Sequence, residues 1–233
     1  MEVQVAAAKV GKYATSESGD SLEMIERPEG GLSFVLVDGQ RSGKAAKNIS
    51  IVVARKAISL LAEGIRDGAA ARAASDYLYT YRSGKVSATL NILSIDLASK
   101  TIVITRNNPA PVVLIRAGEV QLLDTPTDPV GIRRGTRPDI TEIALEENMT
   151  IIVYTDGLTH AGDRRGSPMD VPGFIEKLLQ AESPDPAKWA DQLLEHAVEL
   201  DEGRPADDIS VLVVATMPHS GDDTRRLHIR MPI

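Results

Sequence analysis

Residues 149–162 read MTIIVYTDGLTHAG, and this stretch decides the fold that the sequence predicts. Residues 150–154 are apolar or β-branched, which is typical of a buried strand. Asp156 and Gly157 follow almost at once, and the glycine is expected to let the chain turn sharply where the strand ends. A carboxylate at the end of a buried strand is costly to desolvate unless a cation lies beside it. We therefore expect Asp156 to have a cationic partner.

The same arrangement occurs at two other places in the chain. The run SFVLV precedes Asp38, and the pair Asp207 and Asp208 precedes the run ISVLVV. A fourth acid, Asp20, ends a polar loop that follows a predicted first strand. The alternation of residues does not choose between Asp207 and Asp208. Three carboxylates at strand ends favour a metal site, although a single Asp-Gly is also typical of an ordinary turn.

The chemistry of these donors points to a particular kind of metal. They are oxygen atoms, and the chain has no cysteine. Carboxylates, carbonyls and water select hard cations such as Mg²⁺, Mn²⁺ or Ca²⁺ rather than zinc. Two such ions roughly 3.5–4 Å apart can activate a bridging water and polarise a phosphoryl group.

The composition limits the classes of function. With 233 residues, the chain is long enough for one large domain with a substantial core. A net charge of −7 and the scattering of Lys and Arg argue against nucleic-acid binding. The lack of cysteine excludes disulfides, thiol catalysis and Cys-zinc sites. The first residues do not read as a signal peptide, and no apolar run approaches the ~18 residues of a membrane span, so we expect a cytoplasmic protein without membrane contact.

The periodicity of the whole chain predicts an α+β protein. We expect helices at 42–61, 69–81, 174–181 and 186–201, and strands at 2–10, 21–26, 32–37, 86–97, 101–106, 112–115, 120–123, 140–145, 149–154 and 207–215. This order lacks the β-α alternation of a parallel sheet. It predicts two stacked antiparallel sheets of about a dozen strands, with a helix pair on each side. Residues 86–123 are expected to form an antiparallel meander, and a tight turn is expected between 140–145 and 149–154.

One motif suggests a different function. The segment GQRSGKA, residues 39–45, follows a predicted strand and opens a helix, as a nucleotide-binding P-loop does. It has three residues between its glycines instead of four, and Ala45 stands where a P-loop has the Ser or Thr that holds Mg²⁺. No parallel sheet is predicted either, so we disfavour this interpretation.

Read together, four motifs resemble the metal-dependent protein phosphatase (protein phosphatase 2C) superfamily. They are SGD ending at Asp20, VDG ending at Gly39 with Ser-Gly and a helix after it, YTDGLT around Asp156, and DDISV beginning at Asp207. The bacterial SpoIIE-type branch, with RsbU and RsbX, is more similar. RNNPAP at 106–111 resembles its Asn-Ala-Gly-His-Pro-Pro turn, without the Gly-His, and PVGI at 129–132 resembles its Pro-Leu-Gly segment. The motifs occur in family order from about residue 5 to 216.

This resemblance implies a fold and an activity. The fold would be an α-β-β-α sandwich of two antiparallel sheets flanked by helix pairs. Residues 1–216 would form the catalytic domain and 217–233 a C-terminal tail. The activity would be dephosphorylation of phosphoserine or phosphothreonine by metal-activated water, with no covalent intermediate.

The resemblance also assigns roles to individual residues. Asp38 would bridge two Mn²⁺ or Mg²⁺ ions, and the Gly39 carbonyl would bind one of them. Asp156 and Asp207 would complete the shell of one ion, since the family pattern selects Asp207 of the two neighbouring acids. Asp20 would act through water or hold a more weakly bound ion. Asp38 and Asp156 are therefore the predicted catalytic residues.

Two other side chains near these motifs are candidates for smaller roles. The loop after Asp38 usually carries a further Gly or a Gly-His pair, whereas here it reads Gln40-Arg41. Arg41 would bind the substrate phosphate, because a guanidinium suits bidentate contact with phosphate; the alternative is a solvated loop charge. His160 lies four residues after Asp156, and we expect it at the surface or behind the site rather than as a general acid.

The substrate is inferred by analogy with the family. It would be a phosphorylated regulatory protein of the partner-switching kind, namely an anti-sigma-factor antagonist or a stressosome component. Two alternatives remain at this point. One is a catalytically weak binding module with the same fold, and the other is a two-metal phosphohydrolase of small phosphoesters.

Overall fold

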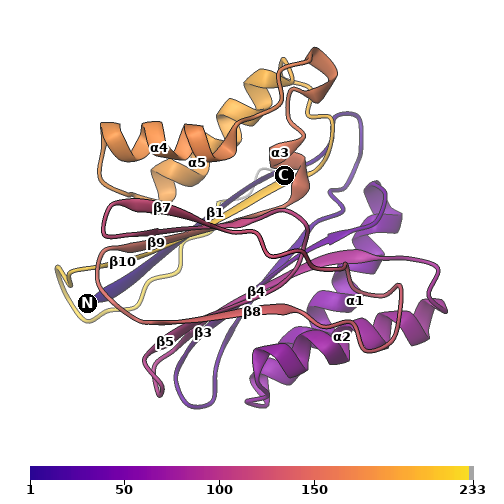
Figure 1. Ribbon diagram of the computed structural model, residues 1–233, viewed down its shortest axis with the longest axis horizontal. Helices are drawn as coiled ribbons and strands as arrows, with labels where there is room; N and C mark the ends of the chain where they lie inside the picture. Colours follow the sequence, from indigo (N-terminus) through magenta and orange to yellow (C-terminus); the bar gives the residue numbers. More distant parts are fainter. Residues whose placement is uncertain (231–233) are drawn as a thin grey trace.

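Two five-stranded antiparallel sheets stack on each other in this computed structural model, which describes residues 1–230 (Figure 1). The first sheet has the spatial order β1 (Glu2–Val10), β10 (Ile209–Met217), β9 (Met149–Tyr154), β6 (Val112–Arg116) and β7 (Glu119–Leu123). The second has the order β2 (Ser21–Glu26), β3 (Gly31–Gly39), β4 (Ala88–Asp96), β5 (Thr101–Asn107) and β8 (Asp139–Ala144). The α+β class and the two-sheet sandwich are confirmed. Both sheets are antiparallel, so the P-loop interpretation is excluded.

A helix pair covers the outer face of each sheet, as Figure 1 shows. The second sheet is covered by α1 (Gly43–Ala62) and α2 (Asp67–Arg82), and the first by α4 (Val171–Ala181) and α5 (Pro186–Leu200). Each of α4 and α5 begins after an aspartate whose side chain accepts a backbone N–H bond, with a proline in its first turn. Both features stabilise a helix start. The short helices α3 (Asp156–Thr159) and η1 (Asp163–Arg165) lie between β9 and α4.

Strand β9 is buried at every position, which explains why its sequence is almost entirely apolar. Ile152 and Tyr154 belong to the core between the first sheet and its helices. Ile151 and Val153 belong to the core between the two sheets. Because both faces are covered, no polar alternation is possible, and each fully buried side chain of this size contributes roughly 1.5–3 kcal/mol.

The predicted meander is wrong at the step from β5 to β6, whereas its two hairpins, β4–β5 and β6–β7, form as expected. Strands β4 and β5 pair as expected, but β6 belongs to the first sheet, so the chain crosses between the sheets after β5. Strands β8 and β9 also lie in different sheets and do not pair across their connection. A strand in either sheet contributes one face to the core between them, so alternation cannot tell which sheet it joins. The described residues form ten strands, which match the ten predicted ranges in order, against an estimated total of about a dozen.

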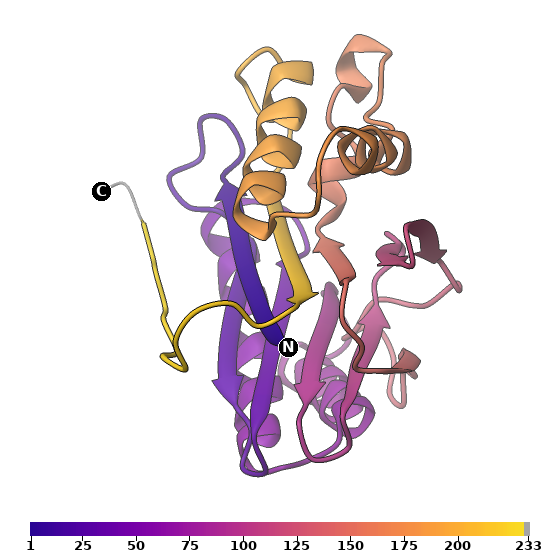
Figure 2. The ribbon, with the colours of Figure 1, turned by 90° about the vertical axis from the view of Figure 1, so that its left-hand side faces the viewer.

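The end of the chain runs along the outside of the sandwich. Strand β10 extends to Met217, and the described residues after it run past β1 and β2 (Figure 2). In this tail, His219 Nδ1 lies 3.1 Å from Glu2 Oε2. The last part of the expected tail, 231–233, lies outside the described residues. No helix among residues 1–230 is both long and apolar enough to cross a membrane.

Candidate active site

The register of the second sheet brings two of the predicted acids together. Strands β2 and β3 pair antiparallel with Ser21 opposite Val37. Asp20 immediately precedes Ser21, and Asp38 immediately follows Val37, so both acids lie at the same end of this pair. Asp20 is fully buried and Asp38 is partly buried.

The first sheet delivers its acids to the same end. Tyr154 at the end of β9 lies opposite Val211 near the start of β10. Asp156 therefore follows one strand where Asp207 precedes the other. Two hydroxyls then join the sheets, because Asp20 Oδ2 accepts hydrogen bonds from Thr155 Oγ1 at 3.0 Å and from Ser210 Oγ at 2.6 Å.

Three of these acids, Asp20, Asp38 and Asp207, are costly to ionise where they lie. Burial, and after it the charges of Asp20, Asp156 and Asp207, together raise the pKa of Asp38 to about 9. Burial raises the pKa of Asp20 to about 6, against the hydrogen bonds from Ser210 and Thr155. Burial also raises the pKa of Asp207 above its ordinary value. A cation is the natural partner for such a group of carboxylates.

The donors at this end suit a hard divalent cation. Besides the bonds to its Oδ2 atom, Asp20 has a buried Oδ1 atom with no hydrogen-bond partner among residues 1–230. Carboxylate oxygens are the ligands that Mg²⁺ and Mn²⁺ prefer. Within the described part of the chain, no group of three Asp, Glu or His side chains is arranged so that it could hold one metal ion. The donor chemistry thus fits a hard cation held by fewer carboxylates together with carbonyl oxygens and water.

The structure separates the roles of Asp207 and Asp208. Asp208 is buried, and its two carboxylate oxygens accept hydrogen bonds from the backbone N–H groups of Lys12 and Gly19, each at 2.9 Å. It therefore anchors the loop that leads to Asp20. Asp207 is less buried, contributes to the raised pKa of Asp38, and has Lys12 Nζ at 3.9 Å from its Oδ1 atom. Of the two acids, Asp207 stays the candidate ligand.

The glycines beside the acids are required for close packing. A Cβ atom on Gly157 would lie 2.0 Å from the carbonyl oxygen of Asp208, and one on Gly39 would lie 2.1 Å from that of Ala46. Neither glycine has a positive φ. The expected sharp glycine turn after Asp156 is therefore wrong, because the chain enters helix α3 there. Gly157 instead lets this helix approach the start of β10.

Substitution of this glycine gives a stability prediction. We expect Gly157→Ala to lower the free energy of unfolding by about 1–3 kcal/mol or more, because the added methyl group meets backbone that cannot move aside. Urea denaturation followed by circular dichroism measures the loss. Gly11→Ala is the matched control, since its Cβ atom would meet its nearest neighbours at 3.6 Å, an ordinary contact. Equal stability of the two variants would contradict the prediction.

Arg41 and His160 both lie at the surface. Arg41 is exposed and has a left-handed backbone with φ of 81°, an uncommon conformation for a residue other than glycine. It makes no side-chain hydrogen bond or ion pair with any residue in the 1–230 range. The His160 side chain is 57% exposed, with Nδ1 at 3.9 Å from Asp156 Oδ2. This places His160 at the surface, as expected.

Several residues that organise this end were not predicted. They include the hydroxyls of Thr155 and Ser210, and two lysines, Lys9 and Lys47, whose Nζ atoms each lie 2.6 Å from the carbonyl oxygen of Asp20. Their signal in the sequence is weak, because Ser, Thr and Lys at such positions are ordinary surface residues. Only the pairing of the strands and, for Lys47, the packing of helix α1 against the sheet show that they converge on Asp20.

The turn at 106–111 packs against the end of β9 despite its unusual sequence. Asn108 donates from Nδ2 to the carbonyl oxygen of Tyr154 at 3.3 Å and accepts from the N–H of Ala110 at 2.9 Å. The buried Arg106 donates to the carbonyl oxygen of Asn108 at 2.8 Å. The second asparagine therefore fixes the turn beside Asp156 without the Gly-His pair.

Comparison with known proteins identifies the family. The family model for Stage II sporulation protein E (SpoIIE) matches residues 28–217. Stage II sporulation protein E of Priestia megaterium is 24% identical over 218 residues, which are 92% of this chain but only 36% of that protein. The chain thus spans about a third of the length of this curated relative.

Solved structures share the fold. The PP2C phosphatase domain of SpoIIE from Bacillus subtilis, solved with a fragment of its regulatory domain, matches with a TM-score of 0.78 and 23% identity, over 92% of this chain and 63% of that one. The catalytic domain of the serine/threonine protein phosphatase PstP, in complex with 2 manganese ions, matches with a TM-score of 0.70 and 18% identity, over 93% of this chain and 99% of that one. Since the family model covers most of its length, the chain belongs to the SpoIIE family, and it shares its fold with the PP2C phosphatase domains.

Proposed function

We propose that this chain is a metal-dependent serine/threonine protein phosphatase that hydrolyses phosphoserine or phosphothreonine on a regulatory protein. One observation carries the proposal: acids from both sheets meet at one end, where burial and their mutual repulsion raise the pKa of Asp38 to about 9. Membership of the SpoIIE family supports it. We propose residues 1–216 as the catalytic domain and 217–233 as a tail.

The proposed metal ligands are the acids predicted from the sequence. Asp38 would bridge two Mn²⁺ or Mg²⁺ ions, with the Gly39 carbonyl on one of them, and Asp156 and Asp207 would complete the shell of one ion. Asp20 would act through water or hold a weaker ion. When bound, such ions lower the pKa of water and polarise a phosphoryl oxygen. The two manganese ions in the related PstP structure support the choice of metal and number.

The residues of this chain would position the reactants. Thr155 and Ser210 hold one oxygen of Asp20, which leaves its other oxygen as an acceptor. Asp208 fixes the loop before Asp20 through two backbone N–H groups. In the reaction, a water oxygen would bond to phosphorus while the ester P–O bond breaks, and the serine or threonine oxygen would take up a proton. The products are inorganic phosphate and the free hydroxyl.

Purified protein tests this proposal directly. We expect Mn²⁺-dependent release of phosphate from a protein phosphorylated on serine, and none when EDTA is added. Activity on phosphoproteins but not on small metabolite phosphates is the expected pattern. Hydrolysis of small phosphoesters alone would favour the phosphohydrolase alternative. Inactivity with every divalent metal would favour a binding module.

Arg41 gives a separate prediction about substrate binding. We expect Arg41→Ala to raise the KM for a phosphopeptide about tenfold with little change in kcat, because a charged hydrogen bond to phosphate contributes roughly 1.5–3 kcal/mol. Arg41→Lys keeps the charge but loses the bidentate fork, so it should recover part of the loss. Steady-state kinetics of the three proteins measure the effect. Unchanged kinetics in Arg41→Ala would remove this residue from the site.

A further inference from the structure

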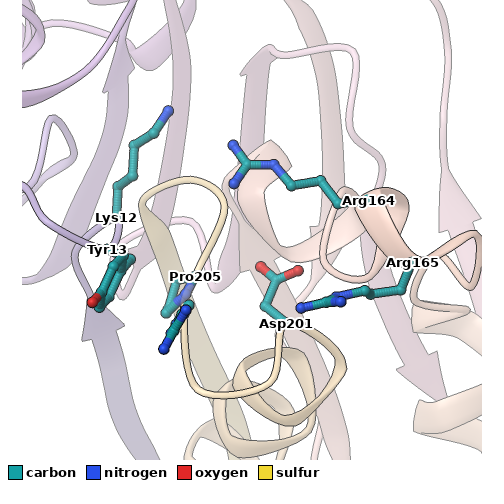
Figure 3. Close-up of a pocket in the computed structure, with 7 residues that line it drawn as sticks. Lys12, Tyr13, Arg164, Arg165, Asp201 and Pro205 are labelled. Carbon is teal, nitrogen blue, oxygen red and sulfur yellow. The ribbon is translucent and has the colours of Figure 1, made fainter.

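A basic pocket lies next to the acids, on the side of helix α5. It encloses about 430 Å³ and is lined by Lys12, Tyr13, Arg164, Arg165, Asp201, Arg204 and Pro205. These residues come from three separate segments, namely the loop after β1, helix η1 and the turn after α5. In Figure 3, Arg164 reaches toward the middle of the pocket from one side, and Lys12 and Tyr13 lie on the other. None of these cations was predicted as a site residue.

Hydrogen bonds hold the three segments in place. The Tyr13 N–H donates to the Pro205 carbonyl oxygen at 2.9 Å, which ties the first loop to the turn after α5. Asp201 is buried, and its two oxygens accept from the backbone N–H groups of Gly162 at 3.0 Å and Ala206 at 2.7 Å. The pocket is therefore built before any ligand binds.

The positive charges of the pocket are only partly neutralised. Arg165 donates to Glu202 at 2.6 Å, and Asp201 adds one negative charge to the four cations that line the pocket. The Arg204 guanidinium lies 5.4 Å from the ring centre of Tyr13, a cation–π contact that leaves its charge in place. Arg164 has no hydrogen bond or ion pair with any residue between 1 and 230. On a protein of net charge −7, this pocket is a local positive surface that faces solvent.

The pocket adjoins the proposed phosphatase centre through Lys12. This residue lines the pocket, while its Nζ atom lies 3.9 Å from Oδ1 of Asp207. A peptide whose phosphorylated residue reaches the acids would extend by ~3.3 Å per residue, so its near neighbours come within reach of the pocket. The volume is in the range of sites that enclose a sizeable ligand, which gives room for more than one side chain.

We infer that this pocket binds acidic side chains that flank the phosphorylated residue, and that it thereby selects acidic substrate sequences. This inference rests on the proposed phosphatase function. Arg164 and Arg204 would contact the carboxylates from two walls, and Lys12 would lie between them and the reacting phosphate. Such contacts are electrostatic and exposed, so they weaken as salt rises.

Two phosphopeptides test the inference. They carry the same phosphoserine, flanked by glutamates in one and by alanines in the other. We expect the wild-type protein to have the higher kcat/KM for the acidic peptide, and Arg164→Glu to reduce the ratio of the two values about tenfold. Because each ratio is taken within one protein, a general loss of activity cancels. The preference should also shrink near 1 M salt, where the Debye length is about 3 Å.

Arg55→Glu is the matched control, because it makes the same change of charge at an exposed position in α1, in the helix layer of the other sheet. It should leave the ratio as in the wild type. A ratio that does not change in Arg164→Glu overturns the inference, as does an equal change in Arg55→Glu. If the two peptides react alike while inorganic phosphate inhibits the wild type more than Arg164→Glu, the pocket holds free phosphate instead, and the inference is also overturned.

A binding measurement separates this inference from the proposed activity. Fluorescence anisotropy follows a labelled acidic peptide that carries no phosphate, so it requires no catalysis. Weaker binding to Arg164→Glu than to Arg55→Glu supports the pocket even if the protein hydrolyses nothing, in which case only the proposed function fails. Equal binding to both variants, with hydrolysis intact, refutes the pocket alone.

Discussion

Asp38→Asn should abolish phosphatase activity and, at the same time, make the metal-free protein harder to unfold. The loss of activity follows from the proposed bridging role. Metal activation contributes several kcal/mol to such reactions, and each 1.36 kcal/mol is a factor of ten, so we expect a decrease of at least about 10³-fold. Phosphate release from a phosphoprotein in Mn²⁺ measures it.

The gain in stability has a different cause. Burial and the charges of Asp20, Asp156 and Asp207 raise the pKa of Asp38 to about 9, so ionising this group opposes folding. Asparagine has the same shape and no charge. We expect the free energy of unfolding in EDTA to rise by on the order of 1–3 kcal/mol, measured by urea denaturation.

Asp67→Asn is the matched control for stability. Asp67 is also buried, but its Oδ2 atom lies 3.0 Å from Arg27 Nη1. Removing its charge leaves a largely buried guanidinium without its partner, so this variant should lose stability. If Asp38→Asn instead loses stability as Asp67→Asn does, the four acids do not oppose folding. Full activity in Asp38→Asn would disprove the proposed function.

The second large effect is the way pH changes the stability of the folded protein, with metal and without it. The pKa of Asp38 in the folded protein, about 9, lies above its ordinary value of 3.8. Between these values the folded state holds a proton that the unfolded state has released. Stability of the metal-free protein should therefore fall as pH rises from about 4 toward 9. The raised pKa of Asp20, about 6, adds to this fall between about 4 and 6.

Bound metal should reverse this trend. Metal ligands must be deprotonated, so affinity rises with pH. At a free metal concentration about 100 times the Kd, binding adds about 2.7 kcal/mol. For a domain of this size, that corresponds to a rise in Tm of roughly 5–10 °C. We expect this rise to be larger at pH 8 than at pH 6, and to disappear in EDTA.

Thermal denaturation at several pH values, with and without Mn²⁺, measures how the metal-free stability and the metal-induced rise in Tm each change with pH. Asp38→Asn is the control here, since it lacks the titrating group. Both the fall of metal-free stability with pH and the growth of the Mn²⁺-induced rise in Tm with pH should become shallower in this variant. Metal-free stability that increases from pH 5 to 8 would show that the pKa of Asp38 is not raised in the folded protein. An equal rise in Tm at every pH would show that binding releases no proton from these acids.

The four long helices and most strands were predictable because their periodicity reflects burial on a single face or on both, whereas the short helices α3 and η1 were not predicted. Helix α1 was expected at 42–61 and lies at Gly43–Ala62, since its apolar residues recur at helical spacing. Strand β9 was expected at 149–154 and occupies Met149–Tyr154. The assignment of β6 and β8 to sheets was not predictable, because a strand in either sheet contributes to the same inner core.

The candidate site was predictable only in part. An aspartate at the end of an apolar run is visible in the sequence, so Asp38, Asp156 and the pair Asp207 and Asp208 could be proposed as a group. Thr155 could not be recognised as a partner of Asp20, because 135 positions separate them and only strand pairing joins them. The basic pocket was missed for the same reason.

The sequence by itself determined which residue types end the strands, and hence that this protein has acids suited to divalent cations. The tertiary structure decided which of them act together. Asp208 faces two backbone N–H groups and anchors a loop, while its neighbour Asp207 contributes to the raised pKa of Asp38. The physical reason is that charges interact through space. Their effect depends on distances and burial, which the register of two sheets sets and which no local pattern of residues contains.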